Sequence, residues 1–278
     1  MESSPPSERF RELAARLSGG EPVGLAEVAL AVAGELAPGL DAPAARAALD
    51  RLGSEAAHVV PREGPLAARV AQLTAFLGGP AGFCGDETSY GDPRNSFLDA
   101  VLARRKGIPI TLAIVYVEVG ARVGLPLAGV SFPAHFLVRT EADPPLVIDA
   151  YHGRVVDETE LRARLARALG EDAAFGPERL APASPADVAV RMLANLKHGF
   201  AARHEWLRAL DCCERILLVT PGALGELRDR GLLYEQLECF GPALADLERF
   251  LALVPGSPEA DSLRARVEAL RPRAAAIH

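Results

Sequence analysis

A histidine and an aspartate stand in a stretch where short apolar runs alternate with turn residues. His135 precedes the run Phe-Leu-Val-Arg, and fourteen residues later Asp149 closes the run Val-Ile-Asp. If the two runs are neighbouring strands, the register decides whether both side chains share a face. A carboxylate beside an imidazole orients the ring and stabilises its protonated form. From the residues alone, the favoured interpretation is a buried hydrogen bond that holds two strands together; the alternative is a catalytic or ligand-binding site.

A nucleophile is missing from the position where it would be most reactive. A thiol at a helix N-terminus has a lowered pKa, but the helix expected after residues 107–109 starts near Thr111 and contains no cysteine. We expect the Thr111 hydroxyl to satisfy free backbone N–H groups of that helix. A catalytic Thr111 is the less favoured alternative, because an unactivated threonine is a weak nucleophile.

Cys84 lies in a Gly-rich loop of the same region. A flexible loop that carried this thiol to His135 would form a Cys–His pair and supply a nucleophile. The simpler interpretation is a small loop residue in a reducing compartment, and we favour it.

Other polar residues nearby have two interpretations each. Arg94 and Asn95 either line the rim of a pocket that binds an acidic group or belong to a helix cap and a solvated helix end. Tyr151 is a candidate for the pocket lining. His152 could extend a metal-like set with His135 and Asp149, but no fourth ligand stands at a useful spacing. The sequence therefore predicts neither a metal nor another cofactor.

The elements that must position these residues are mostly helical. Apolar spacing and stop signals predict helices near 10–17, at 25–36, after an Asp41 cap, at 66–77, from a cap at Asn95 or Ser96, at 111–123 and at 157–169. Short apolar runs at 127–132, 136–140 and 146–150 predict a small antiparallel sheet. Helices packed on such a sheet give an α+β fold.

The last hundred residues contain a repeat of 34 residues. This spacing separates Ala209 from Ala243 and Pro221 from Pro255, and the pattern resembles tetratricopeptide repeats. Small alanines let paired helices approach closely, and a capping helix is expected at 263–270. The groove of such an array commonly holds a peptide or a partner helix. We therefore predict a protein or peptide partner.

Composition excludes several classes of protein. The 278 residues carry 30 basic and 37 acidic side chains, a formal charge of −7, which opposes binding to nucleic acid. The longest apolar run, at 110–117, is far shorter than the roughly 20 residues of a membrane span. Four cysteines and no secretory signal point to a cytoplasmic protein.

Several phrases of the sequence together resemble a known family. They are GF-x-G at 82–85, the pair Asp92-Pro93, the pair Asn95-Ser96, GIPITL, FPAHFLVR and IDAYHG. The stretch that carries them resembles the SirB-one family, which joins a transglutaminase-like core of the second type to C-terminal tetratricopeptide helices. The resemblance extends over about 30–270 and is most specific over 82–153.

The resemblance implies roles for named residues. In active transglutaminase-like and papain-like enzymes, a cysteine at a helix start, a histidine and an aspartate form the triad. By analogy His135 and Asp149 are the histidine and aspartate, and Thr111 lies nearest the cysteine position. The family commonly carries Ser or Thr there, which implies a degenerate active site. Ala134 replaces the glycine usual before the histidine, and the family motif includes Arg94 and Asn95.

We therefore expect an α+β protein with a helix-rich transglutaminase-like (papain-like) core, a small antiparallel sheet and an all-α tetratricopeptide-like region. The expected regions are 1–80, helical and packed on the core; 81–180, the core; and 186–274, the repeats. The favoured function is a non-catalytic regulatory or protein-interaction module. The alternatives are an acyl-transfer or amide-hydrolysing enzyme, with Cys84 or Thr111 as nucleophile beside His135 and Asp149, and a small-ligand sensor.

Overall fold

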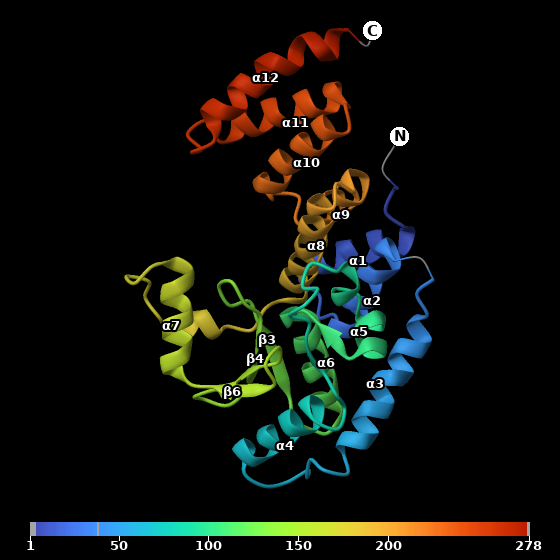
Figure 1. Ribbon diagram of the computed structural model, residues 1–278, viewed down its shortest axis with the longest axis vertical. Helices are drawn as coiled ribbons and strands as arrows, with labels where there is room; N and C mark the ends of the chain where they lie inside the picture. Colours follow the sequence, from blue (N-terminus) through green and yellow to red (C-terminus); the bar gives the residue numbers. More distant parts are fainter. Residues whose placement is uncertain (1–3, 38, 277–278) are drawn as a thin grey trace. The chain divides into compact units, whose positions relative to one another are not determined.

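The computed structural model describes residues 4–37 and 39–276, and they form two compact units. Residues Pro22–Val188 make up the core unit, and residues up to Glu21 join those from Ala189 onward in the repeat unit (Figure 1). The helices of the core unit are α2 (Leu25–Leu36), α3 (Ala42–Ala56), α4 (Leu66–Gly78), α5 (Leu98–Arg104), α6 (Pro109–Arg122) and α7 (Glu158–Leu169). The remaining helices are α1 (Glu8–Ser18), α8 (Pro185–Ala202), α9 (Trp206–Val219), α10 (Leu224–Gln236), α11 (Phe240–Leu253) and α12 (Ala260–Ala275).

Helix α6 is the central element of the core unit. Pro109 occupies its first turn, where a missing N–H costs nothing. Ten of its residues are buried, from Pro109 to Gly120, so the helix is apolar all round. It packs against α2, α3 and strand β3. Burial on every side explains why this β-branched run forms a helix, as predicted for 111–123.

A four-stranded antiparallel sheet packs beside α6. Its strands, in the order β3-β4-β5-β6, are β3 (Leu127–Val130), β4 (Leu137–Thr140), β5 (Val147–Asp149) and β6 (Arg154–Val156). Val138 lies opposite Ile148, so His135 just before β4 and Asp149 at the end of β5 reach the same end of the sheet. The three predicted strands are present and the α+β fold is confirmed. The sequence did not indicate β6 or the short parallel pair β1 (Cys84–Gly85) and β2 (Lys106–Gly107).

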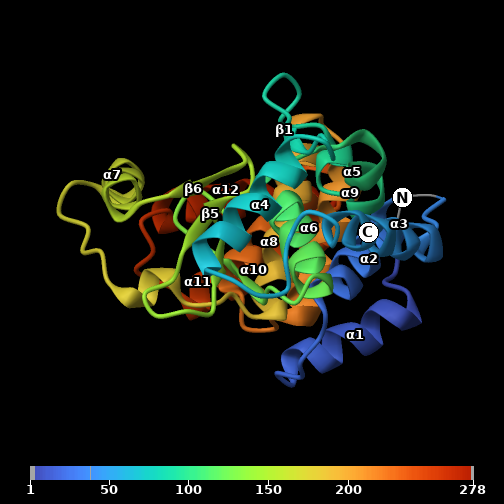
Figure 2. The same cartoon turned by 90° about the horizontal axis from the view of Figure 1, so that it is seen from below.

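Helix α7 covers one apolar face of this sheet, the face that carries Leu137 and Val147. Leu161 and Leu165 share a buried cluster with Val130, Leu137 and Val147. Asp157 caps the helix by accepting from the backbone N–H of Glu160 at 2.8 Å. In Figure 2 the helix is seen nearly end-on. This packing decides which side chains of α7 reach the end of the sheet that carries Asp149.

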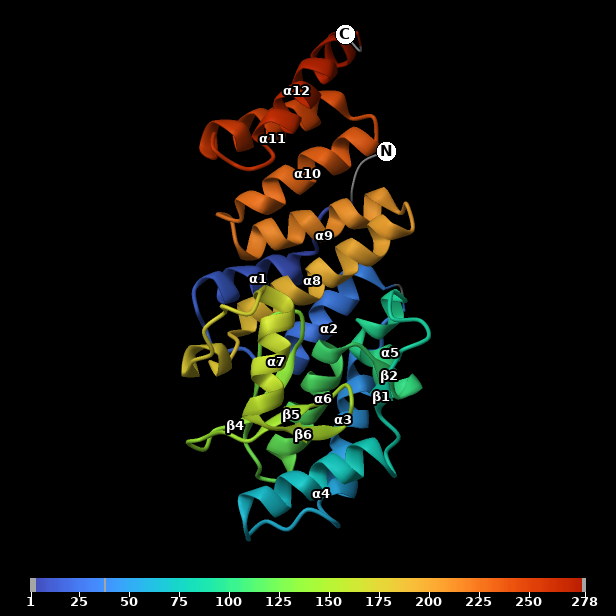
Figure 3. The same ribbon diagram turned by 60° about the vertical axis from the view of Figure 1, so that its left-hand side comes forward.

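Helices α8 to α12 follow one another as a stack in the repeat unit (Figure 3). Ala209 and Ala243 are fully buried. Gly231 lies so close to α11 that an added Cβ would be 2.8 Å from Cγ of Leu247. Small residues therefore permit the close helix pairing that the repeat pattern predicted.

Helix α1 belongs to the repeat unit. Phe10, Leu13 and Leu17 are buried, and Oγ of Ser18 donates to the carbonyl of Val219 at 2.7 Å. Apolar periodicity shows that one face of a helix is buried, but it does not identify what covers that face. The predicted division into 1–80, packed on the core, 81–180 and 186–274 stays a prediction. Within the described ranges, no helix has the length and apolar character needed to cross a membrane.

Candidate functional site

His135 and Asp149 form the pair that the sequence predicted. Nε2 of His135 donates to Oδ1 of Asp149 at 3.1 Å. The Asp149 side chain is fully buried, and the His135 side chain is 16% exposed. Strand register brings the two together, because β4 and β5 are adjacent and antiparallel. Among the described residues nothing hydrogen-bonds to Nδ1 of His135, so this nitrogen is available to a ligand.

Asp149 has further partners that the sequence did not indicate. Its oxygens also accept from the backbone N–H groups of Tyr151 and His152, from Nδ1 of His152 at 2.7 Å and from Nη2 of Arg164 at 2.6 Å. Burial by itself raises the pKa of Asp149, but the hydrogen bonds and charges of His135, Arg164 and His152 outweigh it and hold the pKa well below its usual range. Asp149 is therefore an ionised anchor for both imidazoles.

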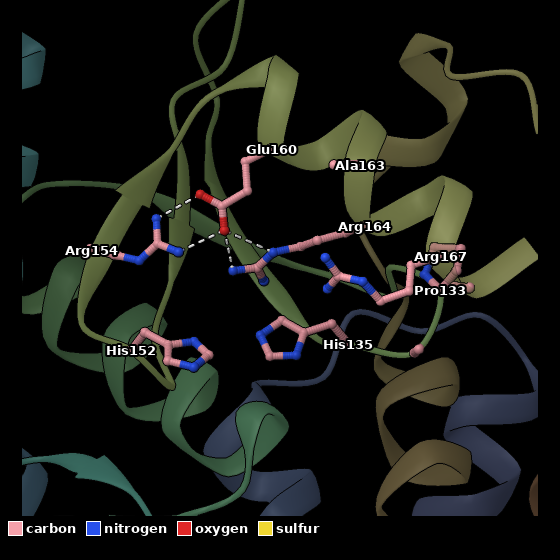
Figure 4. Close-up of a pocket in the computed structure, with 10 residues that line it drawn as sticks. Pro133, His135, His152, Arg154, Glu160, Ala163, Arg164 and Arg167 are labelled. Atoms are coloured by element: carbon pink, nitrogen blue, oxygen red, sulfur yellow. Dashed lines mark hydrogen bonds and ion pairs between the residues drawn. The ribbon is translucent and has the colours of Figure 1, made fainter. Parts of the chain in front are cut away.

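An arginine–glutamate network extends this site along α7 and β6. Both terminal nitrogens of Arg154 donate to Glu160 at 2.6 Å, and Nη2 of Arg164 donates to the same carboxylate at 2.6 Å (Figure 4). The bonds from Arg154, and then those from Arg164, lower the pKa of Glu160 to about 2 despite some burial. Arg164 thus connects Glu160 with Asp149. The contact between Arg164 and Asp149 forms only because α7 packs on the sheet. The spacing of residues in the sequence therefore does not predict it.

A cavity of about 460 Å³ opens beside the two imidazoles. Its lining is Pro133, Ala134, His135, His152, Arg154, Glu160, Ala163, Arg164, Arg167 and Ala168. Ala134 has a φ of 56°, in the left-handed region that favours glycine. This conformation explains why a glycine suits the position, and an alanine there costs about 1 kcal/mol.

The histidines and Asp149 also resemble a set of metal ligands. One ligand atom from each of His135, Asp149 and His152 lies within 4.8 Å of the others. However, both carboxylate oxygens already accept hydrogen bonds, and the Arg164 guanidinium donates to one of them. A fixed positive charge at this distance opposes a cation. The donor set therefore suits hydrogen bonding better than metal ligation.

Thr111 is placed differently from the expectation. Its hydroxyl donates to the carbonyl of Asn95 at 2.6 Å and lies 3.1 Å from that of Ile108. It therefore does not accept from free N–H groups as predicted. The 3-10 turn Pro93–Asn95 places the carbonyl of Asn95 near the start of α6, and this carbonyl accepts the hydrogen bond from the Thr111 hydroxyl. Thr111 is fully buried and is absent from the lining of the His135 cavity.

Arg94 and Asn95 lie in a loop away from that cavity lining. Asn95 is fully buried, donates from Nδ2 to the carbonyl of Ser89 at 2.7 Å and accepts from Arg104 at 3.0 Å. Arg94 is exposed and pairs with Asp92. The predicted cap at Asn95 or Ser96 is wrong, because α5 starts at Leu98 with no side-chain cap. The ligand-binding roles of Arg94 and Asn95 stay a prediction.

Cys84 is exposed on β1 and lines a smaller cavity of about 210 Å³, together with Tyr151 and His152. The backbone N–H of Gly85 donates to the carbonyl of Tyr151 at 3.0 Å, which fixes the strand beside that residue. An added Cβ on Gly85 would lie 2.3 Å from the Tyr151 ring. The structure thus groups Cys84 with His152 in one cavity, and the pairing of Cys84 with His135 stays a prediction.

Comparison with known proteins agrees with this architecture. The transglutaminase-like superfamily matches residues 43–194, and a tetratricopeptide repeat family matches residues 196–268. A UPF0162 protein of Xylella fastidiosa is 43% identical over 202 residues, which are 70% of this chain and 72% of that protein. A UPF0162 protein of Vibrio cholerae is 34% identical over 248 residues, or 88% of this chain and 92% of that protein.

Protein SirB1 of Salmonella typhimurium is 30% identical over 209 residues, which are 74% of this chain and 78% of that protein. No solved structure shows a significant match. The superfamily match covers more than half of the chain, and the relatives are matched over most of their length. The chain therefore belongs to the SirB1 and UPF0162 family, with a transglutaminase-like core followed by a tetratricopeptide region.

Proposed function

We propose that this protein is a non-catalytic binding protein, in which the core keeps an ordered His–Asp pair and the helical repeats hold a protein or peptide partner. The observation that carries the proposal is the state of Thr111. Its buried hydroxyl points its proton at the carbonyl of Asn95, 2.6 Å away.

A hydroxyl nucleophile needs a base within hydrogen-bond reach and an open path to the substrate. Thr111 has neither in this arrangement, because a main-chain carbonyl occupies its proton and its side chain is fully buried. Asp149 holds His135 as it would hold a catalytic histidine. However, the hydroxyl nearest the family's nucleophile position, that of Thr111, is hydrogen-bonded to the segment that precedes α6. The retained pair then acts as a ligand-binding element.

The repeats supply the surface for a partner. Stacked helix pairs of this type form grooves that bind peptides or helices. A buried Lys197 on α8 donates to Glu226 at 2.6 Å and Asp229 at 2.7 Å on α10, so ion pairs fix the spacing of the helices. A groove whose helices are already fixed binds a partner with a smaller loss of conformational entropy.

A turnover assay of the purified full chain tests the proposal. Activated esters, a glutamine-containing peptide and a primary amine acceptor would be incubated with wild type, with His135→Ala and with His58→Ala. His58 is exposed and is absent from the lining of both histidine-containing cavities. We expect all three proteins to give the same background rate. Turnover by wild type and His58→Ala that disappears in His135→Ala would contradict the proposal.

A second candidate, an acyl-transferring or hydrolysing enzyme, is favoured by one observation. Cys84 shares a cavity with His152, and Nδ1 of His152 donates to Oδ2 of Asp149 at 2.7 Å. A thiol, an imidazole and a carboxylate in this order can form a nucleophilic relay. Turnover in the same assay that is lost in Cys84→Ser and His152→Ala, but kept in His135→Ala, would support this candidate.

A further inference from the structure

The cavity beside His135 carries more positive than negative charge. Arg154 and Arg164 are balanced by Glu160 and the buried Asp149. Arg167 also lines the cavity, and within the part of the chain that the structure describes it makes no hydrogen bond or ion pair. With both imidazoles neutral, three guanidinium groups face two carboxylates and leave one uncompensated positive charge.

We propose that this cavity binds a small molecule through a carboxylate or phosphate group, with Arg167 as the main donor. Arg167 follows Arg164 by three residues, so both side chains project from the same face of α7. Figure 4 shows the Arg167 guanidinium extended into the cavity towards His135. The planar guanidinium fork matches the oxygens of either anion.

The two imidazole rings form the opposite wall of the cavity. The rings of His135 and His152 are stacked, with centroids 6.2 Å apart and an angle of 23° between the planes. One nitrogen of each ring is hydrogen-bonded to Asp149. The other nitrogens, Nδ1 of His135 and Nε2 of His152, have no partner among the described residues. In a neutral ring the second nitrogen is an acceptor, and it donates to an oxyanion only when the ring carries both protons. Asp149 and Arg164 hold the rings in place and act as positioning residues.

The size of the cavity limits the class of ligand. A volume of about 460 Å³ lies within the range of about 300–1,000 Å³ typical of small-molecule sites. Glu160 on the lining repels a second anionic group placed near it. These features favour a metabolite-sized anion over a polyanion such as nucleic acid. The inference concerns the core unit alone and does not depend on a partner of the repeats.

Calorimetric titration of the full chain tests the inference, with inorganic phosphate and succinate as probes and chloride holding the ionic strength constant. Arg167→Gln removes the uncompensated charge without breaking an ion pair that the structure shows. Arg162→Gln is the matched control, because Arg162 is on the same helix, pairs with Glu158 and is absent from the cavity lining.

We expect wild type and Arg162→Gln to bind at least one of the two anions with equal affinity, and Arg167→Gln to bind it about tenfold or more weakly. Binding of phosphate alone assigns a phosphate ester, and binding of succinate alone assigns a carboxylate. Equal binding by wild type and Arg167→Gln, or no binding of either anion up to about 10 mM, would overturn the inference.

Discussion

Asp149 shows how one buried carboxylate organises the site. It accepts five hydrogen bonds from His135, Tyr151, His152 and Arg164. The pairing of Asp149 with His135 was predictable, because a hairpin of two short apolar runs brings them together. The contribution of Arg164 was not, since it depends on how α7 packs on the sheet. The cap role of Thr111 was predicted wrongly because the sequence does not reveal the carbonyl above the helix start.

Replacing Asp149 with Asn tests the importance of this charge. The variant leaves Arg164 without its buried partner, so we expect the free energy of unfolding to fall by about 2–4 kcal/mol at pH 7. The pKa of Asp149 is lowered in the folded protein. The ionised carboxylate therefore stabilises the fold fully above the pKa of the unfolded chain, near 3.9, and this stabilisation is lost as the pH falls below that value. The difference between the proteins should therefore shrink by about 1 kcal/mol at pH 3.

Urea denaturation at both pH values measures this effect. Asp172→Asn is the control, because Asp172 is exposed in the loop after α7, and it should change stability by less than about 0.5 kcal/mol. A loss for Asp149→Asn that is the same at pH 7 and pH 3 would show that the ionised carboxylate is not the stabilising group.

Helices and strands were predictable wherever the stretch of regularly spaced apolar residues was long enough to show a period. The helix at 25–36 and the Asp41 cap are confirmed, since Asp41 accepts from the backbone N–H of Ala44 at 2.9 Å. Strand β6 and the pair β1–β2 span only two or three residues each, too short for a periodic signal. They nevertheless matter, because β1 presents Cys84 and β6 presents Arg154.

Helices α10 and α11 pack closely at Gly231, so we expect a larger residue there to destabilise the protein. In an exposed helix, Gly→Ala stabilises by up to about 1 kcal/mol. At Gly231 the new Cβ would lie 2.8 Å from Cγ of Leu247 and 3.2 Å from Cβ of Asp246, so we expect a destabilisation of about 1–3 kcal/mol.

Thermal and urea unfolding of Gly231→Ala and Gly225→Ala compare the two situations. Gly225 is on the same helix, and an added Cβ there has no heavy atom outside its own neighbourhood within 4 Å. We expect Gly225→Ala to be neutral or slightly stabilising. If Gly231→Ala is also stabilising, the helices do not pack as closely as described.

The repeat unit joins the first helix of the chain to the C-terminal helices. Helix α1 packs on α9, about 200 residues later in the sequence. Two repeat pairs alone are fewer than the three that usually form a stable array. We infer that α1 supplies apolar surface that the repeats lack.

Phe10→Ala tests this role of α1. Phe10 is 1% exposed, and truncating a buried phenylalanine costs about 3–5 kcal/mol. We expect amide hydrogen exchange to become faster in α9 (Trp206–Val219) and to stay unchanged in α6 (Pro109–Arg122). Faster exchange in α6 with unchanged exchange in α9 would place α1 on the core instead.

In the proposed function, no nucleophile of this chain works with the histidines that Asp149 anchors. Site-resolved alkylation of Cys84 in the native protein, read by mass spectrometry across pH 6–9, shows whether such a nucleophile exists. We predict the same rate profile for wild type, His135→Ala, His152→Ala and the control His58→Ala. A profile in which Cys84 loses its reactivity near neutral pH in either His135→Ala or His152→Ala, but not in His58→Ala, would contradict the claim and establish a functional Cys–His pair.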